Sequence, residues 1–149
     1  MTDDFTVPYG VLVPVEVYWD DLDFLGTLYH PRFVALLDRA VTAHWISRGY
    51  RLAGHQLDED GYQLLREVSI SFDHPVTDFG TLLMHIWAEK AGTTSMVLGF
   101  RLLSGDGSVQ YAHGHRVSIK FDPATKRPSP WTGRARADLA ALLREPAAV

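Results

Sequence analysis

The feature that most constrains the fold is one long segment with helical periodicity. Through residues 31–47 apolar side chains recur every 3.6 residues and form one stripe, made of Phe33, Leu37, Ala40, Val41 and His44. Pro31 suits the first helical turn, and Gly49 suits the position just after a helix end. The segment therefore predicts a helix of about 25 Å, with a stripe wide enough for the central helix of a domain.

Segments with strand periodicity lie on both sides of this helix. Residues 11–17 alternate in polarity, and Pro14 favours an edge position because proline has no backbone N–H to donate. A short helix is predicted near the end of the chain, over 136–143. The four remaining strands are predicted at 62–73, 82–90, 95–103 and 108–121. This order favours an α+β fold with a five-stranded antiparallel sheet around one helix.

Length and composition exclude several classes of protein. A chain of 149 residues has the size of one domain, so we expect a single domain over 1–149, with its core at about 11–130 and a C-terminal tail at 131–149. The absence of cysteine excludes disulfides and cysteine nucleophiles. A net charge of −4 argues against a nucleic-acid partner, and no apolar run is long enough for a membrane span. The acidic N-terminus does not resemble a signal peptide, and we expect a cytoplasmic protein.

The common catalytic motifs are missing, and two weaker signals do not favour a site. The sequence contains no nucleophile elbow, phosphate-binding loop or zinc-protease motif. His113 and His115 fall on one face of a predicted strand, but no third ligand is evident, so we expect no metal. The four tryptophans are more typical of a core or an interface than of a base-stacking platform: Trp19, Trp45, Trp87 and Trp131.

A loop rich in aspartate precedes the predicted helix. Asp23 lies seven residues before His30, and the helix begins directly afterwards. The start of a helix carries unpaired N–H groups and a partial positive charge, which can stabilise a developing oxyanion, and a nearby carboxylate can act on the same carbonyl carbon. The spacing alone favours a different interpretation, in which Asp20, Asp21 and Asp23 serve only as caps that satisfy the loop and the helix end, because such caps are common.

The segment from Val17 to Phe33 carries a more specific pattern. It contains the spacing Asp21-x-Asp23-x-x-Gly26, followed by Tyr29-His30 just before the predicted helix. This segment resembles the signature of hotdog-fold acyl-CoA thioesterases, in particular the 4-hydroxybenzoyl-CoA thioesterase family and its YbgC-like branch. A looser similarity extends over about residues 11–130.

The resemblance implies a fold and a set of site residues. The fold would be the α+β hotdog fold, in which a five-stranded antiparallel sheet wraps around a long central helix. Asp23 would be the catalytic carboxylate, acting as general base or nucleophile, and the backbone N–H of Tyr29 would polarise the thioester carbonyl. The YbgC-like branch also implicates His30. The implied substrate contacts include Trp19 and Gly26.

The sequence departs from the family pattern at three positions. Trp19 stands where the YbgC-like branch carries tyrosine, so a hydroxyl is missing. Phe24 and Leu25 replace the small residues that usually precede the glycine. Their bulk is expected to narrow or reshape the acyl pocket.

The resemblance also implies a substrate and an assembly. The substrate would be an acyl-CoA thioester, hydrolysed to a carboxylic acid and free CoA, and no cofactor is expected because CoA is part of the substrate. The chain would form a homodimer or a dimer of dimers, with each site between subunits and no nucleic-acid or membrane partner. Lys90, Lys126 and Arg127 are the candidates for contact with the CoA phosphates.

The strand predicted over 62–73 supports the same assembly. Alternation places Leu64, Val68, Ile70 and Phe72 on one face, and the edge of this strand needs a partner. We therefore expect a dimer with one continuous sheet.

Two other functions remain open at this point. The chain could be an acyl-carrier-protein thioesterase of a biosynthetic pathway, in which the pantetheine arm of a carrier replaces CoA. It could also be a hotdog dimer that binds an acyl thioester without cleaving it, which predicts tight binding and turnover no faster than in buffer.

Overall fold

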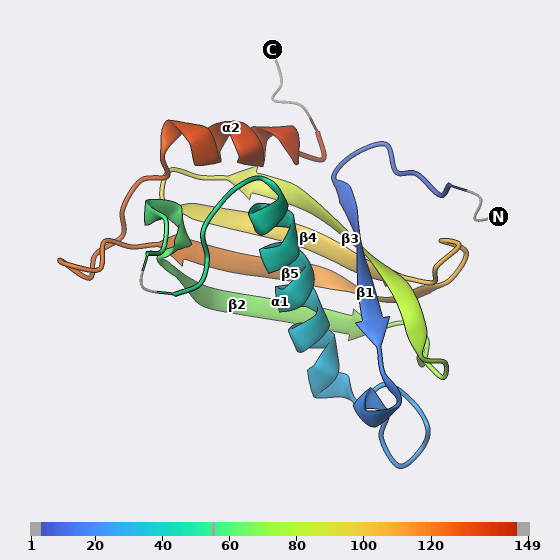
Figure 1. Ribbon diagram of the computed structural model, residues 1–149. Coiled ribbons are helices and arrows are strands. Elements are labelled where there is room, and N and C mark those ends of the chain that lie inside the picture. The colour runs from blue at the N-terminus through green and yellow to red at the C-terminus, as the bar shows by residue number, and fades with distance from the viewer. Residues whose placement is uncertain (1–3, 55, 146–149) are drawn as a thin grey trace.

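The computed structural model describes residues 4–54 and 56–145, which contain one antiparallel sheet and two α-helices (Figure 1). A short 3-10 turn precedes each of α1 and β2, at Trp19–Asp21 and Glu59–Gly61. The main elements are β1 (Val11–Val17), α1 (His30–Ser47), β2 (Gln63–Phe72), β3 (Gly80–Ala91), β4 (Ser95–Leu103), β5 (Gln110–Lys120) and α2 (Gly133–Ala141). The predicted α+β class is confirmed.

The sheet has the strand order β1-β3-β4-β5-β2, and all its neighbours are antiparallel. β1 and β2 are therefore the two edges, which confirms the edge position predicted from Pro14. α1 carries the chain from one edge to the other and crosses one face of the sheet (Figure 1). The register of β1 pairs Val17 with Gly80, so the end of β1 and the start of β3 lie together, beside the loop that leads into α1.

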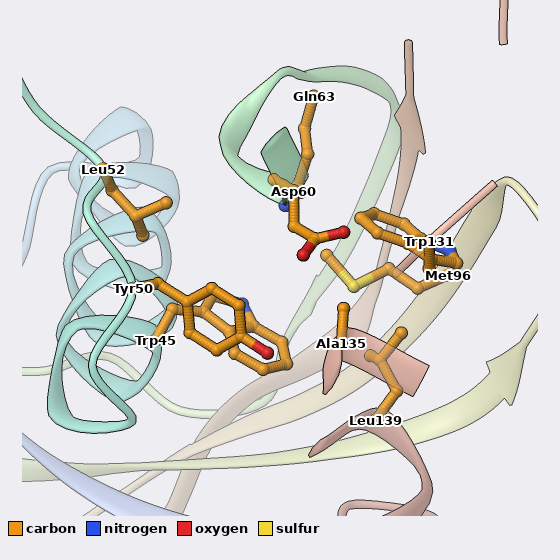
Figure 2. A pocket seen from close by; sticks show the side chains of 9 residues that line it. All are labelled: Trp45, Tyr50, Leu52, Asp60, Gln63, Met96, Trp131, Ala135 and Leu139. Atoms are coloured by element: carbon orange, nitrogen blue, oxygen red, sulfur yellow. Dashed lines mark hydrogen bonds between the residues drawn. The ribbon is translucent and has the colours of Figure 1, made fainter. Parts of the chain in front are cut away.

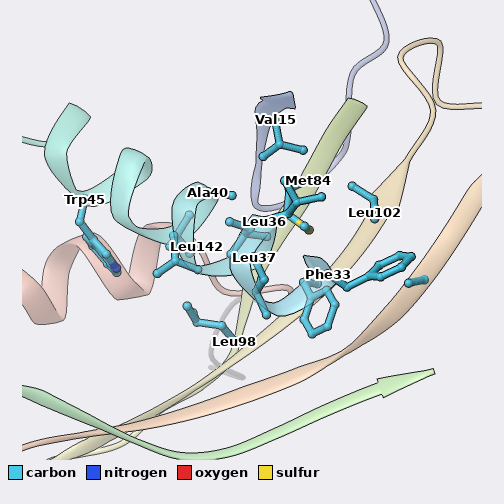
Figure 3. Close-up of a cluster of buried hydrophobic side chains, with 14 of the residues drawn as sticks. Val15, Phe33, Leu36, Leu37, Ala40, Trp45, Met84, Leu98, Leu102 and Leu142 are labelled. Atoms are coloured by element: carbon cyan, nitrogen blue, oxygen red, sulfur yellow. The ribbon is translucent and has the colours of Figure 1, made fainter. Parts of the chain in front are cut away.

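The core lies between α1 and this face of the sheet (Figure 3). The helix buries Phe33, Leu36, Leu37, Ala40, Val41 and Trp45. From the sheet, Met84, Leu98 and Leu102 are each at most 1% exposed and belong to the same cluster. Burying each large aliphatic side chain contributes about 1.5–3 kcal/mol, so this stripe fixes how α1 lies on the sheet. The helix begins one residue earlier than predicted, at His30, and ends where expected.

One prediction about β2 is wrong. Leu65 pairs with Ser118 and Glu67 pairs with Val117, so Arg66 is an extra residue in the strand. This bulge reverses the alternation, and Leu64 faces away from the helix while Leu65 joins Val68, Ile70 and Phe72 on the helix side. Counting alternate residues in the sequence cannot detect such an insertion.

The predicted C-terminal helix exists but lies earlier in the chain. α2 begins at Gly133 because the Thr132 side chain caps it, accepting a hydrogen bond from the Ala135 N–H at 3.2 Å. After α2 the chain pairs with β3: the Ala88 N–H donates to the Leu142 carbonyl at 2.7 Å. The C-terminal segment thus extends the β1 edge of the sheet. Among the described residues, no helix is both long and apolar enough to cross a bilayer.

Candidate active site

The loop between β1 and α1 is organised around the Asp23 carboxylate. Its Oδ1 accepts hydrogen bonds from the backbone N–H groups of Leu25 and Thr27, at 2.8 and 3.2 Å. Its Oδ2 accepts one from the Thr27 hydroxyl at 3.1 Å. Gly26 has φ +76°, a left-handed conformation that glycine adopts without strain, and this residue lets the loop close on the carboxylate.

These contacts also decide the charge of Asp23. Partial burial raises its pKa, but the hydrogen bonds from Thr27 and Leu25, together with the nearby His30, outweigh burial and hold the pKa below the usual 3.8. The carboxylate is therefore ionised at neutral pH. A carboxylate in this state can accept a proton or attack a carbonyl carbon.

Asp23 and His30 border one cleft of about 310 Å³ at the start of α1. One wall is apolar, with Phe33 and Phe72 packed edge to face at 5.0 Å between ring centroids. The segment after β2 forms another wall, and the Leu28 N–H fixes it by donating to the Val76 carbonyl at 2.8 Å. The remaining lining residues are Thr27, Leu28, Asp73, His74, Pro75 and Val76. The structure thus brings the two predicted site residues together beside a surface that suits an apolar group.

The helix start offers a different backbone donor from the predicted one. The Tyr29 N–H donates to the Asp21 carbonyl at 3.0 Å, so it is already engaged. Pro31 has no N–H, and the Arg32 N–H donates to the Tyr29 carbonyl at 2.8 Å. No acceptor in the described part of the chain takes the His30 N–H. The free donor at the positive end of α1 is therefore that of His30.

Asp21 has a structural place in the same loop. It is 6% exposed, and its Oδ2 accepts a hydrogen bond from the Tyr18 N–H at 2.9 Å. Its Oδ1 lies 3.7 Å from the Arg32 Nε. Asp21 therefore ties the loop to α1, whereas Asp23 faces the cleft.

The bulky residues of the loop do not fill the cleft. Phe24 and Leu25 are 95% and 72% exposed, so their side chains project into solvent, contrary to the expected narrowing of the pocket. Trp19 is 74% exposed and lines a separate open hollow with Tyr18, Asp20 and Phe79. Its predicted contact with substrate stays a prediction.

The three basic candidates lie far from Asp23 within this chain. Lys90 is near the end of β3, ten residues from Gly80, which at strand spacing is about 33 Å away. Lys126 and Arg127 are exposed in the segment after β5, at the same far end of the sheet. The structure does not bring any of them to the cleft of its own chain.

A second cavity lies at the other end of α1 and is closed. Side chains from α1, β4 and α2 converge on it, together with Tyr50 and Asp60 (Figure 2). Its free volume of about 10 Å³ holds roughly one water molecule. The Asp60 carboxylate is occupied by Thr132, accepting from its hydroxyl at 2.6 Å and its N–H at 3.1 Å. These contacts join α2 to the domain and leave no room for a substrate.

The two strand histidines contact different carboxylates. His113 Nδ1 lies 2.8 Å from Asp73 Oδ2, and His115 Nε2 lies 2.7 Å from Glu67 Oε1. Within residues 4–54 and 56–145, no group of three or more histidine, cysteine or acidic side chains is placed to hold a metal ion.

Comparison with models of protein families identifies the family of this chain. The family model described as Thioesterase superfamily matches residues 25–110, more than half of the chain. The chain belongs to the thioesterase superfamily. This thioesterase is a thioester hydrolase with the α+β hotdog fold that the resemblance implied. A comparison with curated proteins finds no match.

Several solved structures share this fold. The PA2801 protein from Pseudomonas aeruginosa is 25% identical, with a TM-score of 0.77 over 87% of this chain and 97% of that one. A thioesterase from Thermus thermophilus, complexed with coenzyme A and Zn, is 21% identical, with a TM-score of 0.72 over 93% and 97% of the two chains. Slr0204, a 1,4-dihydroxy-2-naphthoyl-CoA thioesterase from Synechocystis, is 16% identical, with a TM-score of 0.73 over 89% and 98%.

Sequence reasoning missed two features of the cleft. The first is the hydrogen bond from the Thr27 hydroxyl to the Asp23 carboxylate, four residues earlier in the chain. The local signal for it is indirect: an aspartate in a loop commonly accepts from a backbone N–H two residues on, as Asp23 does from Leu25. Phe72 reaches the cleft from the far edge of the sheet. No local signal connects it with Phe33, because the contact depends on how α1 crosses β2.

Proposed function

We propose that this thioesterase hydrolyses acyl-CoA thioesters in the cleft bordered by Asp23 and His30. The observation that supports this most is that Asp23, with its ionised carboxylate, and His30, with its free backbone N–H at the helix start, border the same cleft. Thioester hydrolysis needs both groups, because one activates the attack and the other stabilises the oxyanion that forms.

The chemistry assigned to Asp23 has two routes with the same products. As general base, Asp23 takes a proton from water while the water oxygen bonds to the thioester carbon. The C–S bond then breaks, and the thiolate of CoA takes up the proton. As nucleophile, Asp23 bonds to the carbon and expels the thiolate, and water then hydrolyses the resulting anhydride. Both routes end in a carboxylic acid and free CoA, and neither uses a metal or a prosthetic group.

The role assigned to His30 combines its backbone and its side chain. Its N–H lies at the positive end of α1 and would donate to the carbonyl oxygen as negative charge develops there. The imidazole borders the same cleft as Asp23 and would hold the attacking water. The apolar wall of Phe33 and Phe72 would take the acyl group.

A CoA substrate is supported by two neighbours and by the location of the basic residues. The Thermus thermophilus neighbour is described as complexed with coenzyme A, and the Synechocystis neighbour acts on a CoA thioester. Lys126 and Arg127 lie at the end of the sheet opposite to Asp23. They could reach the CoA phosphates only from a second copy of the chain.

The edge of β2 would bring that second copy into place. β2 is ten residues long, and one of its edges pairs with no strand of the described chain. Leu64, Leu65 and Phe72 are all more than 40% exposed. Antiparallel pairing of two β2 strands would place the Gln63 end of one copy beside the Phe72 end of the other. The segment with Lys126 and Arg127 lies near the Gln63 end, so the pairing would bring these residues of one copy toward the cleft of the other. We expect a dimer that buries well over about 1,000 Å², and a clean monomer in sedimentation at micromolar concentration would contradict this assembly.

The experiment that tests the proposed function is an assay of free thiol release. A panel of acyl-CoA substrates of varied chain length and aromaticity is compared with the same acyl groups on an acyl carrier protein. We expect turnover above the buffer rate with CoA thioesters and loss of that turnover in Asp23→Asn. Turnover only with carrier thioesters would reassign the substrate. Turnover that is unchanged in Asp23→Asn would remove Asp23 from the site.

A further inference from the structure

The hydrogen bonds of Asp23 are distributed unequally between its two oxygens. Oδ1 accepts two N–H groups, from Leu25 and Thr27, which occupy both of its lone pairs. Among the described residues, Oδ2 accepts only the Thr27 hydroxyl, at 3.1 Å, and keeps one lone pair. All three donors come from the loop itself, so this distribution is fixed before any substrate binds.

We infer that Thr27 is a positioning residue, whose hydroxyl orients the carboxylate of Asp23 and leaves Oδ2 as its reacting oxygen. This inference rests on the proposed function, because it acts through Asp23. Thr27 borders the same cleft as Asp23. Its N–H and its hydroxyl contact different oxygens of the carboxylate, which fixes the plane of the group as a single contact could not.

The effect of Thr27 on the Asp23 carboxylate must be distinguished from the effects of the charged groups nearby. His30 faces it from the start of α1 and favours its ionised form. Asp73 and His74 face the cleft from the segment after β2, and Asp73 is held by His113 and Gln110. Asp21, in the loop, forms an ion pair with Arg32, in the first turn of α1. None of these groups is altered by a substitution at Thr27.

Replacing Thr27 by valine removes the hydroxyl and keeps the size of the side chain. The backbone bonds to Oδ1 remain, so Asp23 stays in the loop, but Oδ2 loses its donor. Loss of a hydrogen bond to the ionised form raises the pKa of Asp23, and we expect the acid limb of kcat/KM to move up by about 0.5–1 pH unit. We also expect kcat at neutral pH to fall by about 3- to 10-fold, with KM changed by less than about 2-fold, because the carboxylate is less well oriented.

The experiment compares kcat/KM over pH 3–7 in wild type, Thr27→Val, Thr27→Ser and Thr77→Val. Thr77→Val is the matched control, since Thr77 is an exposed threonine that does not border the cleft. We expect Thr27→Ser, which keeps a hydroxyl, and Thr77→Val to behave as wild type. An unchanged acid limb in Thr27→Val, or a serine variant as impaired as the valine variant, would overturn the inference.

Two further measurements test the role of Thr27 even if Thr27→Val does not fold. The titration of the Asp23 carboxyl carbon, followed by ¹³C NMR, is expected to shift upward in Thr27→Val and also in Thr27→Ala, which replaces the valine variant if that one does not fold. An unshifted titration would overturn the inference. Asp23→Asn separates the two claims: if this variant stays active, the proposed site fails, whereas an inactive Asp23→Asn with an unshifted Thr27→Val overturns the role of Thr27 alone.

Discussion

Aspartates and aromatic side chains lie near both ends of α1, but the hydrogen bonds of Asp60 and Asp138 differ in range from those of Asp23. At the C-terminal end, Asp60 accepts hydrogen bonds from Thr132, and Asp138 accepts one from Tyr50 at 2.5 Å, so each bond joins segments more than 70 residues apart. At the N-terminal end, the hydrogen bonds that Asp23 accepts within the described part of the chain all come from residues at most four positions away.

The free volume also differs between the two ends of α1. The cavity at the C-terminal end has room for about one water, and Trp45 and Trp131 are buried around it. The cleft at the N-terminal end measures about 310 Å³ and is open. Long-range bonds close one end and stabilise the fold, whereas local bonds orient Asp23 and leave the other end free to bind. Substitutions at the two ends should therefore change different quantities.

The largest expected effect comes from Asp23→Asn. Asparagine keeps an oxygen that can accept the two N–H groups, and its amide can donate to the Thr27 hydroxyl, so the loop should survive. The proposed base or nucleophile is lost, and we expect kcat/KM to fall by at least about 10²-fold with little change in Tm. Steady-state kinetics and thermal unfolding on the same sample measure both quantities.

Asp21→Asn is the control for this variant. Asp21 lies two residues away but faces Tyr18 and Arg32 rather than the cleft. We expect a much smaller loss of kcat/KM than in Asp23→Asn. Equal losses in the two variants would show that the loop as a whole, rather than the Asp23 carboxylate, supports activity.

At the closed end, Asp60→Ala should lower the free energy of unfolding by about 2–3 kcal/mol. The substitution leaves the partly buried Thr132 N–H without its acceptor and loosens the start of α2. The folded fraction should keep its kcat/KM, because the cleft is at the other end of α1. Chemical denaturation followed by assays below the transition tests this, and a specific loss of kcat in fully folded protein would contradict it.

His30→Ala should have an intermediate effect that distinguishes catalysis from packing. The side chain is exposed beside the cleft, and the backbone N–H is retained in the variant. We expect kcat to fall by several-fold to about 10²-fold, less than in Asp23→Asn, with Tm nearly unchanged. If Tm instead drops by several degrees while the surviving protein turns over normally, His30 is structural and the imidazole has no part in the reaction.

The smallest expected effect is a change of Tm with pH, caused by His44 near the C-terminal end of α1. Burial, with help from Arg48, lowers the pKa of His44 below its usual 6.5, so the unfolded chain binds the proton more readily. The contribution of neutral His44 to the free energy of unfolding is fully present above about pH 6.5, and it decreases as the pH falls toward the pKa of His44 in the folded state. We expect Tm to drop by about 1–3 °C between pH 7 and 5, and to drop less in His44→Gln. Asp23 stays ionised throughout this range, so its contribution to kcat should not change.

The sequence predicted the parts of the molecule that depend on local patterns. The apolar stripe of α1 and the loop from Asp21 to His30 are each continuous in the chain, and the predicted helix agrees with α1 within one residue. The bulge at Arg66 and the engagement of the Tyr29 N–H by Asp21 were not predicted, because both depend on how the backbone pairs in three dimensions. The meeting of Phe33 and Phe72 likewise depends on the way α1 crosses the sheet.

Amide hydrogen exchange of the wild-type protein, with and without a non-hydrolysable acyl-CoA thioether, tests the contrast between the two ends most directly. If the open end is the site, exchange slows in residues 18–30 and 73–76, around Asp23 and the apolar wall, and stays unchanged in residues 56–62 and 131–142. Protection confined to the segments around Asp60 and α2, with none around Asp23, would place binding at the closed end and contradict the account.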